Sequence, residues 1–267
     1  MNIDKSRVER QFDKSAHVYD ALSHMQREIV DTLLDECLAS AVDSSCLNPI
    51  VCDFGCGTGY ALAQLAELID APQLIGIDIA PSMLEVANQR LHGLDSVKLM
   101  SGDIEAPPVG IESVDIALSS SAIQWCDVNL ALNQISSTLK PGGHALISSF
   151  SEGTLKEWRE LWGANNGQYF VALDDLEAAA KQAGLIVDKL WVDQQNQRFT
   201  SFKAALSSVR DLGAGDATYS RAKGLMGARK FKAIVQRVEQ LIEQDGAIEL
   251  VYNVVYLKAR KPLNGKR

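Results

Sequence analysis

Three glycines at alternate positions, directly after a short apolar segment, constrain this chain more than any other feature. Residues 50–54 read as a buried strand, Gly55, Gly57 and Gly59 follow it, and residues 60–69 have helical periodicity. Glycines at such a turn let a ligand approach the backbone closely, and the next helix offers unpaired amides at its N-terminus. The pattern predicts a strand, a ligand-binding turn and a helix at the start of a parallel sheet.

The alternation of strands and helices continues along the chain. Strands are expected at 74–79, 97–101, 114–119 and 145–150, with helices from 82 and over 127–139. Five short apolar strands separated in this way predict a doubly wound parallel α/β sheet. Ser82 and Glu85 fit a capping box, and residues 140–143 read as a turn. Later helices are expected near 153–162, 174–183, 201–212 and 228–244, and two further strands at 185–192 and 248–257.

The chain divides into four expected segments. They are an N-terminal helical arm (1–45), a core (46–197), a helical insertion that we expect to form a lid (198–246), and a final strand with a tail (247–267). Charge differs between them: residues 1–197 hold 12 basic and 28 acidic side chains, whereas residues 198–267 hold 14 and 6. The basic segment indicates either solvated helix faces or a surface for an anionic partner.

Composition excludes several classes of protein. The net charge of −8 argues against a nucleic-acid partner, and no apolar run approaches the roughly 20 residues of a membrane span. The N-terminus is charged and lacks a secretory pattern, so we expect a cytoplasmic protein. Neither the five cysteines nor the four histidines have metal-ligand spacing, so no metal is expected.

Three acids accompany the first three strands. Asp53 lies two positions before Gly55, Asp78 ends the second strand, and Asp103 follows the third. A single aspartate at a strand end is commonly a helix cap or turn residue, but acids gathered at one sheet edge favour ribose hydroxyls and a cationic ligand. A dinucleotide motif would have Gly or Ala where Tyr60 stands, and no P-loop is present, so the ligand need not carry a pyrophosphate.

Residues 53–59, 76–84, 101–108 and 139–150 resemble the class I S-adenosylmethionine-dependent methyltransferases. This resemblance implies a Rossmann-like, seven-stranded, mostly parallel sheet with helices on both faces, and S-adenosylmethionine as cofactor. Tyr19 and Gln26 of the arm are candidates for the cofactor entrance, although they could equally be a core aromatic and a solvated helix residue. The expected cofactor-binding residues are Tyr19, Gln26, Asp53, Gly55, Gly57, Gly59, Asp78, Ile79, Met83, Asp103, Ile104 and Ser119.

A narrower resemblance covers nearly the whole chain. Residues 12–20, 22–26, 121–126, 149–155, 209–214 and 224–227 are similar to the malonyl-[acyl-carrier protein] O-methyltransferase family of biotin synthesis. The chain departs from that pattern at Ser207 and Val251. The resemblance implies methylation of the free carboxylate of a malonyl thioester on an acyl-carrier protein, with no catalytic base. It implies these substrate-binding residues: Gln124, Trp125, Phe150 and Arg210.

Other functions stay open at this point. The chain could methylate another small free carboxylic acid, or it could be a non-catalytic regulatory protein that binds the cofactor. Arg210 could instead form a surface ion pair with Asp211 or Asp216, and Trp125 could merely cover the sheet edge. Residues 119–122 differ from the Asn/Asp-Pro-Pro-aromatic element of DNA amino-methyltransferases, which disfavours that class.

Overall fold

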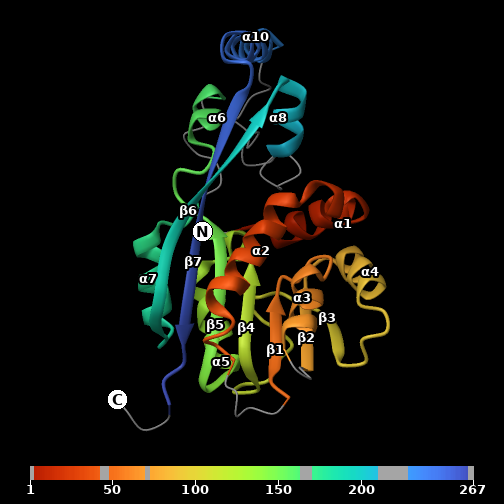
Figure 1. The fold of residues 1–267 in the computed structure, drawn as a ribbon, viewed down its shortest axis with the longest axis vertical. Helices are drawn as coiled ribbons and strands as arrows, with labels where there is room; N and C mark the ends of the chain where they lie inside the picture. Colours follow the sequence, from red (N-terminus) through yellow and green to blue (C-terminus); the bar gives the residue numbers. More distant parts are fainter. Residues whose placement is uncertain (1–2, 43–47, 70–72, 163–169, 210–227, 264–267) are drawn as a thin grey trace.

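A seven-stranded sheet forms the centre of the molecule (Figure 1). The computed structural model describes residues 3–42, 48–69, 73–162, 170–209 and 228–263. The strand order is β3-β2-β1-β4-β5-β7-β6, and only β7 runs antiparallel to its neighbours. The bounds are β1 Ile50–Phe54, β2 Gln73–Asp78, β3 Val97–Ser101, β4 Val114–Ser120, β5 Leu139–Phe150, β6 Ile186–Phe199 and β7 Ile248–Arg260. The predicted seven-stranded, mostly parallel sheet is confirmed.

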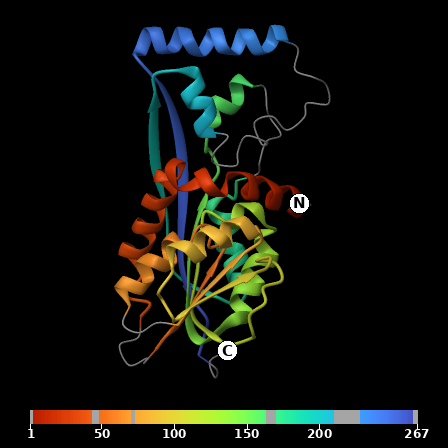
Figure 2. The same ribbon diagram turned by 90° about the vertical axis from the view of Figure 1, so that its right-hand side faces the viewer.

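Helices cover both faces of this sheet, as predicted (Figure 2). One face packs against α2 His24–Cys37, α3 Tyr60–Leu68 and α4 Pro81–Arg90. The other packs against α5 Val128–Thr138 and α7 Leu173–Gln182. Because both faces are covered, the inner strands are apolar along their whole length, and Val51, Cys52 and Phe54 of β1 are fully buried.

The N-terminal helix α1, Lys5–Leu22, crosses the carboxyl ends of the parallel strands and packs against α4 (Figures 1 and 2). The predicted capping box at Ser82 is wrong, because α4 begins at Pro81, whose fixed φ suits the first helical position. The Ser82 amide instead donates to the Asp13 carboxylate of α1, at 2.9 Å. A side chain 69 positions away thus satisfies an amide that local sequence would assign to a local cap.

The structure also changes the predicted turn at residues 140–143. Strand β5 already begins at Leu139, immediately after α5, so these residues lie within the strand. The Gly142 amide donates to the Lys261 carbonyl at 2.9 Å, and the Lys261 amide donates to the Gly143 carbonyl at 2.8 Å. Pairing with the chain beyond β7 therefore extends a segment whose composition is that of a turn.

Strands β6 and β7 form a long ribbon that projects beyond the rest of the sheet (Figure 1). Strand β5 pairs with β7 only over residues 254–260, whereas β6 pairs with it over 248–260. The predicted strand at 185–192 therefore continues to Phe199, through polar residues that the apolar pattern did not include. Three helices gather at the far end of the ribbon: α6 Lys156–Leu161, α8 Phe202–Val209 and α10 Ala228–Asp245.

Helices α8 and α10 confirm the helices predicted at 201–212 and 228–244 in their described parts. Aromatic rings hold this end together: Trp158 lies 5.9 Å from Trp162 and 6.0 Å from Phe202, and Phe231 of α10 lies 6.0 Å from Trp162. None of the helices within the described ranges has both the length and the apolar character that crossing a membrane requires.

Candidate active site at the carboxyl edge of the sheet

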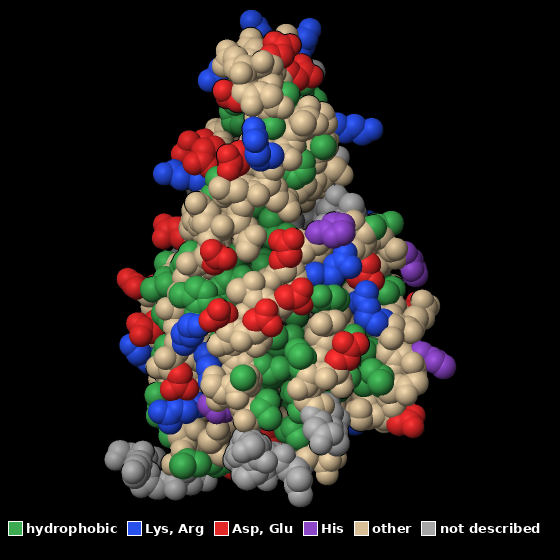
Figure 3. All heavy atoms as spheres, viewed as in Figure 1, with side chains coloured by type: hydrophobic (Ala, Val, Ile, Leu, Met, Phe, Trp, Pro, Cys, Tyr) green, Lys and Arg blue, Asp and Glu red, His purple; other side chains and the backbone are tan. Residues whose placement is uncertain are grey.

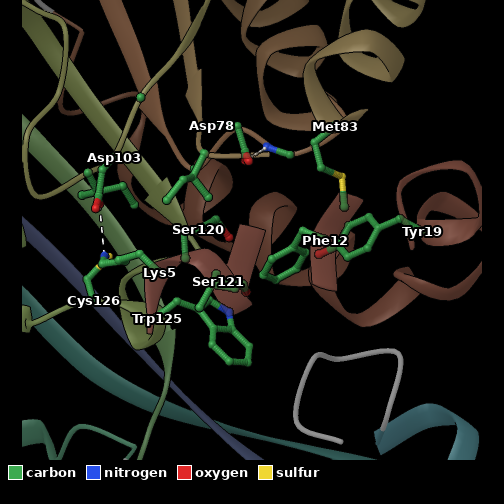
Figure 4. A pocket seen from close by; sticks show the side chains of 17 residues that line it. Lys5, Phe12, Tyr19, Asp78, Met83, Asp103, Ser120, Ser121, Trp125 and Cys126 are labelled. Carbon is green, nitrogen blue, oxygen red and sulfur yellow. Dashed lines mark hydrogen bonds and ion pairs between the residues drawn. The ribbon is translucent and has the colours of Figure 1, made fainter. Parts of the chain in front are cut away.

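An open cavity with about 620 Å³ of empty space lies where β1, β2 and β4 end, beneath α1 (Figure 4). The connections from β1 and β4 leave the sheet in different directions here, and ligands of open α/β sheets bind at such a switch point. Eight of the predicted cofactor-binding residues line this first cavity, and so does Trp125. The eight are Tyr19, Gly55, Gly57, Asp78, Ile79, Met83, Asp103 and Ile104.

A second cavity, with about 460 Å³ of empty space, adjoins the first. The two predicted residues Gln26 and Asp53 line it, together with Arg27 of α2 and Tyr60 of α3. The two cavities share five lining residues, which are Tyr19, Gly55, Gly57, Ser120 and Ser121. The sheet edge therefore offers one continuous site in two halves that meet at the glycine turn.

The glycine turn has the geometry that its sequence predicts. Gly55 has a φ of +82°, and a Cβ atom there would lie 2.4 Å from the Cβ of Ala122. Gly57 has a φ of +52°, and a Cβ atom there would have nothing within 4 Å, because the position faces open space. Its amide donates to Oδ2 of Asp78 at 2.8 Å. Asp78 thus holds the turn while its side chain lines the first cavity.

Burial makes the acids at this edge difficult to ionise. Asp53 is 2% exposed, and burial, followed by repulsion from Asp78, raises its pKa to about 8. Burial also raises the pKa of Asp78 to about 6, although its hydrogen bonds from the Ala80 and Gly57 amides act in the opposite direction. A cation in the cavity would favour the charged form of both groups, so the site is suited to a positively charged ligand.

Two buried polar atoms in the shared region have no hydrogen-bond partner among the described residues: Oε1 of Gln26 and Oγ of Ser121. Buried polar groups are normally hydrogen-bonded, so each favours a ligand group as its partner. Ser121 also has a φ of +52°, which is unusual for a residue with a side chain. A ligand with polar groups at the junction of the two cavities fits both observations.

Five predicted residues do not line either cavity. Gly59 precedes α3, and its Cβ position is 3.1 Å from the Cβ of Ala87, so it allows α3 and α4 to pack closely. Ser119 is buried and donates to the Phe54 carbonyl at 2.8 Å. Arg210 lies outside the described residues.

Gln124 and Phe150 lie behind the cavity wall. Nε2 of Gln124 donates to the Ser121 carbonyl at 2.8 Å, and its Oε1 accepts from Ser149 at 3.1 Å. Phe150 packs within an aromatic cluster, 5.9 Å from Tyr252. Direct substrate contact by these two residues stays a prediction.

The structure adds residues of α1 that the sequence did not single out: Lys5, Val8 and Phe12 line the first cavity. Nζ of Lys5 lies 3.0 Å from Asp103 and 2.7 Å from Glu105, and it donates to Sγ of Cys126 at 3.3 Å (Figure 4). Burial opposes the charge of Lys5, but Glu105 and the other neighbours raise its pKa overall. Its ammonium group thus occupies the centre of an acidic cluster that otherwise has metal-ligand geometry.

Aromatic contacts connect α1 to the strand edge. Phe12 lies 5.7 Å from Trp125 with the rings nearly perpendicular, and 6.3 Å from Tyr19 (Figure 4). Phe12 stands within a segment on which the family resemblance rests, so that resemblance was the available signal, whereas nothing in the sequence marked Lys5. No described residue of 198–246 lines either cavity, so a lid formed by this insertion stays a prediction.

Comparison with known proteins identifies the family. A family model described as a methyltransferase domain matches residues 48–205. The malonyl-[acyl-carrier protein] O-methyltransferase of Methylovorus sp. (strain MP688) is 34% identical over 272 residues, covering 97% of this chain and 90% of the relative. The chain belongs to the malonyl-[acyl-carrier protein] O-methyltransferase family. The enzyme of this name from Laribacter hongkongensis (strain HLHK9) is 31% identical, with 97% and 90% covered.

Solved structures agree with this family in fold. A chain in the complex between the Haloferax volcanii Trm112 methyltransferase activator and the putative methyltransferase superimposes with a TM-score of 0.64 at 20% identity. It covers 97% of this chain and 100% of its own length. The YcgJ protein from Bacillus subtilis gives a TM-score of 0.60 at 17% identity, covering 87% and 99%.

Proposed function

We propose that this protein transfers a methyl group from S-adenosylmethionine to the free carboxylate of a malonyl thioester on an acyl-carrier protein, an early step of biotin synthesis. The observation that carries the proposal is the 34% identity with a malonyl-[acyl-carrier protein] O-methyltransferase over 97% of the chain. The acidic, two-part cavity supports it, because a sulfonium cofactor is a cation and carries no phosphate.

The cofactor would extend across both cavities. Asp78 would accept hydrogen bonds from its ribose hydroxyls, and Asp103 and Ile104 would flank its adenine in the first cavity. The amino-acid end would enter the second cavity, beside Asp53 and Gln26. When bound, the cofactor supplies a methyl group activated by the positive sulfur.

The substrate requires little acid–base chemistry from the protein. A simple carboxyl group has a pKa near ~4, so the malonyl carboxylate is already a nucleophile at neutral pH. The protein would contribute orientation and exclusion of water. Trp125 and Phe12 would close one side of the reaction space, and α1 would cover it. Arg210 would hold the carboxylate through its planar guanidinium group.

Helix α10 offers a docking surface for an acidic carrier protein. Ile234 and Val238 are buried against the ribbon, whereas Arg229, Lys232 and Arg237 are exposed on a segment without acidic residues. Figure 3 shows basic side chains at this end of the molecule, beside acidic ones. A basic surface would raise the association rate of an acidic partner, and salt would weaken this effect.

The docking surface is tested by charge reversal. Lys232→Glu should lower kcat/KM for a malonyl-carrier protein at low salt, and it should leave kcat/KM for malonyl-coenzyme A unchanged. The matched control is Lys98→Glu, at an exposed position of β3. Equal effects of both variants on the carrier-bound substrate would refute docking at α10.

The reaction is tested with purified protein, S-adenosylmethionine and three substrates: malonyl-carrier protein, malonyl-coenzyme A and free malonate. Mass spectrometry should detect one added methyl group on the carrier-bound malonyl thioester, as a methyl ester. Transfer only to free malonate would favour the small-acid alternative. Cofactor binding without transfer to any of the three would favour the non-catalytic alternative.

A further inference from the structure

The second cavity contains a guanidinium group without an acidic partner. Nη2 of Arg27 donates to the backbone carbonyl of Asp20 at 2.6 Å and lies 3.4 Å from Nδ1 of His24. Within the described ranges of the chain, no carboxylate forms an ion pair with it. A partly buried cation that lines a cavity favours an anionic ligand group as its partner.

The ring of Tyr60 supports this guanidinium group. Cζ of Arg27 lies 5.9 Å from the ring centroid, and the Tyr60 hydroxyl donates to Asp31 at 2.8 Å. Cζ of Arg90 lies 6.0 Å from the same centroid, but Arg90 already has the Asp20 carboxylate as its partner. Tyr60 stands where a dinucleotide motif has a small residue, so this departure from the motif provides a platform for Arg27.

The same cavity also contains groups that suit a cation. Asp53 lies at its buried side, and Oε1 of Gln26, the residue before Arg27, is a buried acceptor without a partner. An acceptor pair and a guanidinium group in one cavity match a ligand that carries an ammonium and a carboxylate group together. The end of the cavity at Gly55 and Gly57 joins it to the half with the ribose-binding acid.

We propose that Arg27 binds the α-carboxylate of the cofactor's methionyl group, while Gln26 and Asp53 accept hydrogen bonds from its α-ammonium. This inference rests on the proposed function for the identity of the ligand. It adds a specificity for the amino-acid end of the cofactor, held by consecutive residues of α2. The malonyl carboxylate is the other source of the same chemical group, and the experiment separates the two.

Calorimetry with two nucleosides tests the proposal. S-adenosylhomocysteine has the amino-acid end, whereas 5′-methylthioadenosine has the same adenosine without it. Arg27→Met should weaken the binding of S-adenosylhomocysteine roughly 10- to 100-fold, the scale of a hydrogen-bonded charged group. It should change the binding of 5′-methylthioadenosine by less than about twofold. Arg27→Lys should give an intermediate loss, because lysine keeps the charge without the fork.

The control variant is Arg10→Met on α1, an exposed arginine whose side chain contacts Ser6, and it should leave both affinities unchanged. An equal loss for both nucleosides in Arg27→Met would mean that Arg27 only supports α2, and would overturn the proposal. So would unchanged S-adenosylhomocysteine affinity together with weaker binding of malonyl-carrier protein. A wild-type protein that binds neither nucleoside would refute the proposed function itself.

Discussion

Binding of the cofactor should depend on pH through Asp53. Burial and the neighbouring Asp78 raise the pKa of Asp53 to about 8 in the free protein, so at neutral pH its carboxyl group is mostly protonated. A ligand ammonium group beside it favours the ionised form and therefore lowers this pKa. Binding should then release about one proton at pH 7.

The magnitude follows from the size of the shift. Ionising a group one pH unit below its pKa costs about 1.4 kcal/mol, which is a factor of about ten in affinity. Between about pH 6 and pH 7, the affinity for S-adenosylhomocysteine should therefore rise close to tenfold with pH. Asp78, with its pKa of about 6, adds a smaller slope at the acidic end of this range.

Titration calorimetry at several pH values measures the slope, and buffers of different ionisation enthalpy count the released protons. Asp53→Asn should bind more weakly and lose about one unit of slope in the logarithm of affinity against pH. The neutral nucleoside 5′-methylthioadenosine should show no dependence on Asp53. An affinity for S-adenosylhomocysteine that stays constant from pH 6 to pH 7.5 would refute the reasoning.

Three further outcomes are expected. Asp78→Ala should weaken S-adenosylhomocysteine binding by about 1 to 3 kcal/mol, because ribose hydroxyls lose a buried partner, and unchanged calorimetric affinity would remove Asp78 from this role. Gly59→Ala should lower the free energy of unfolding by about 1 to 2 kcal/mol or more, because φ is +78° and the new Cβ atom lies within 3.3 Å of α4; urea denaturation measures this loss, and wild-type stability would contradict it. Arg210→Ala should abolish most methyl transfer in a mass-spectrometric assay while S-adenosylhomocysteine affinity stays unchanged, and wild-type turnover would exclude Arg210 as the carboxylate ligand.

The pKa shift of Asp53 also affects stability, with a defined sign. The folded protein holds this proton more tightly than the unfolded chain, because the pKa is about 8 against an ordinary 3.8. The free energy of unfolding should therefore fall as the pH rises from about 4 to about 8. Asp53→Asn should remove this part of the dependence in urea denaturation, and an identical slope in both proteins would contradict it.

Sequence reasoning succeeded where local patterns decide the structure. Buried parallel strands are continuously apolar, so β1, β2 and β4 could be located, and the acids at their ends could be assigned to one edge. Eleven predicted ligand residues line the two cavities for this reason. The ribbon beyond Val192 was missed because its exposed polar residues pair with only one neighbouring strand.

Contacts between distant segments account for the remaining differences. Asp13 caps α4 from another helix, and Lys5 reaches Asp103 across 98 positions of the chain. Neither contact leaves a periodic pattern, because each depends on how α1 lies across the sheet. Gln124 shows the same limit: its residue type suits substrate binding, but its position lets it hold the Ser121 carbonyl behind the cavity wall.

The antiparallel strand β7 has a consequence for the order in which the chain can fold during synthesis. It supplies the only sheet partner of β6 and covers the outer edge of β5, yet it begins at Ile248. Until the ribosome has released this last segment, the edge of β5 remains open to pairing with other chains. Truncation before residue 248 should leave β6 unpaired and the nascent sheet prone to aggregation, however complete the ligand-binding edge already is.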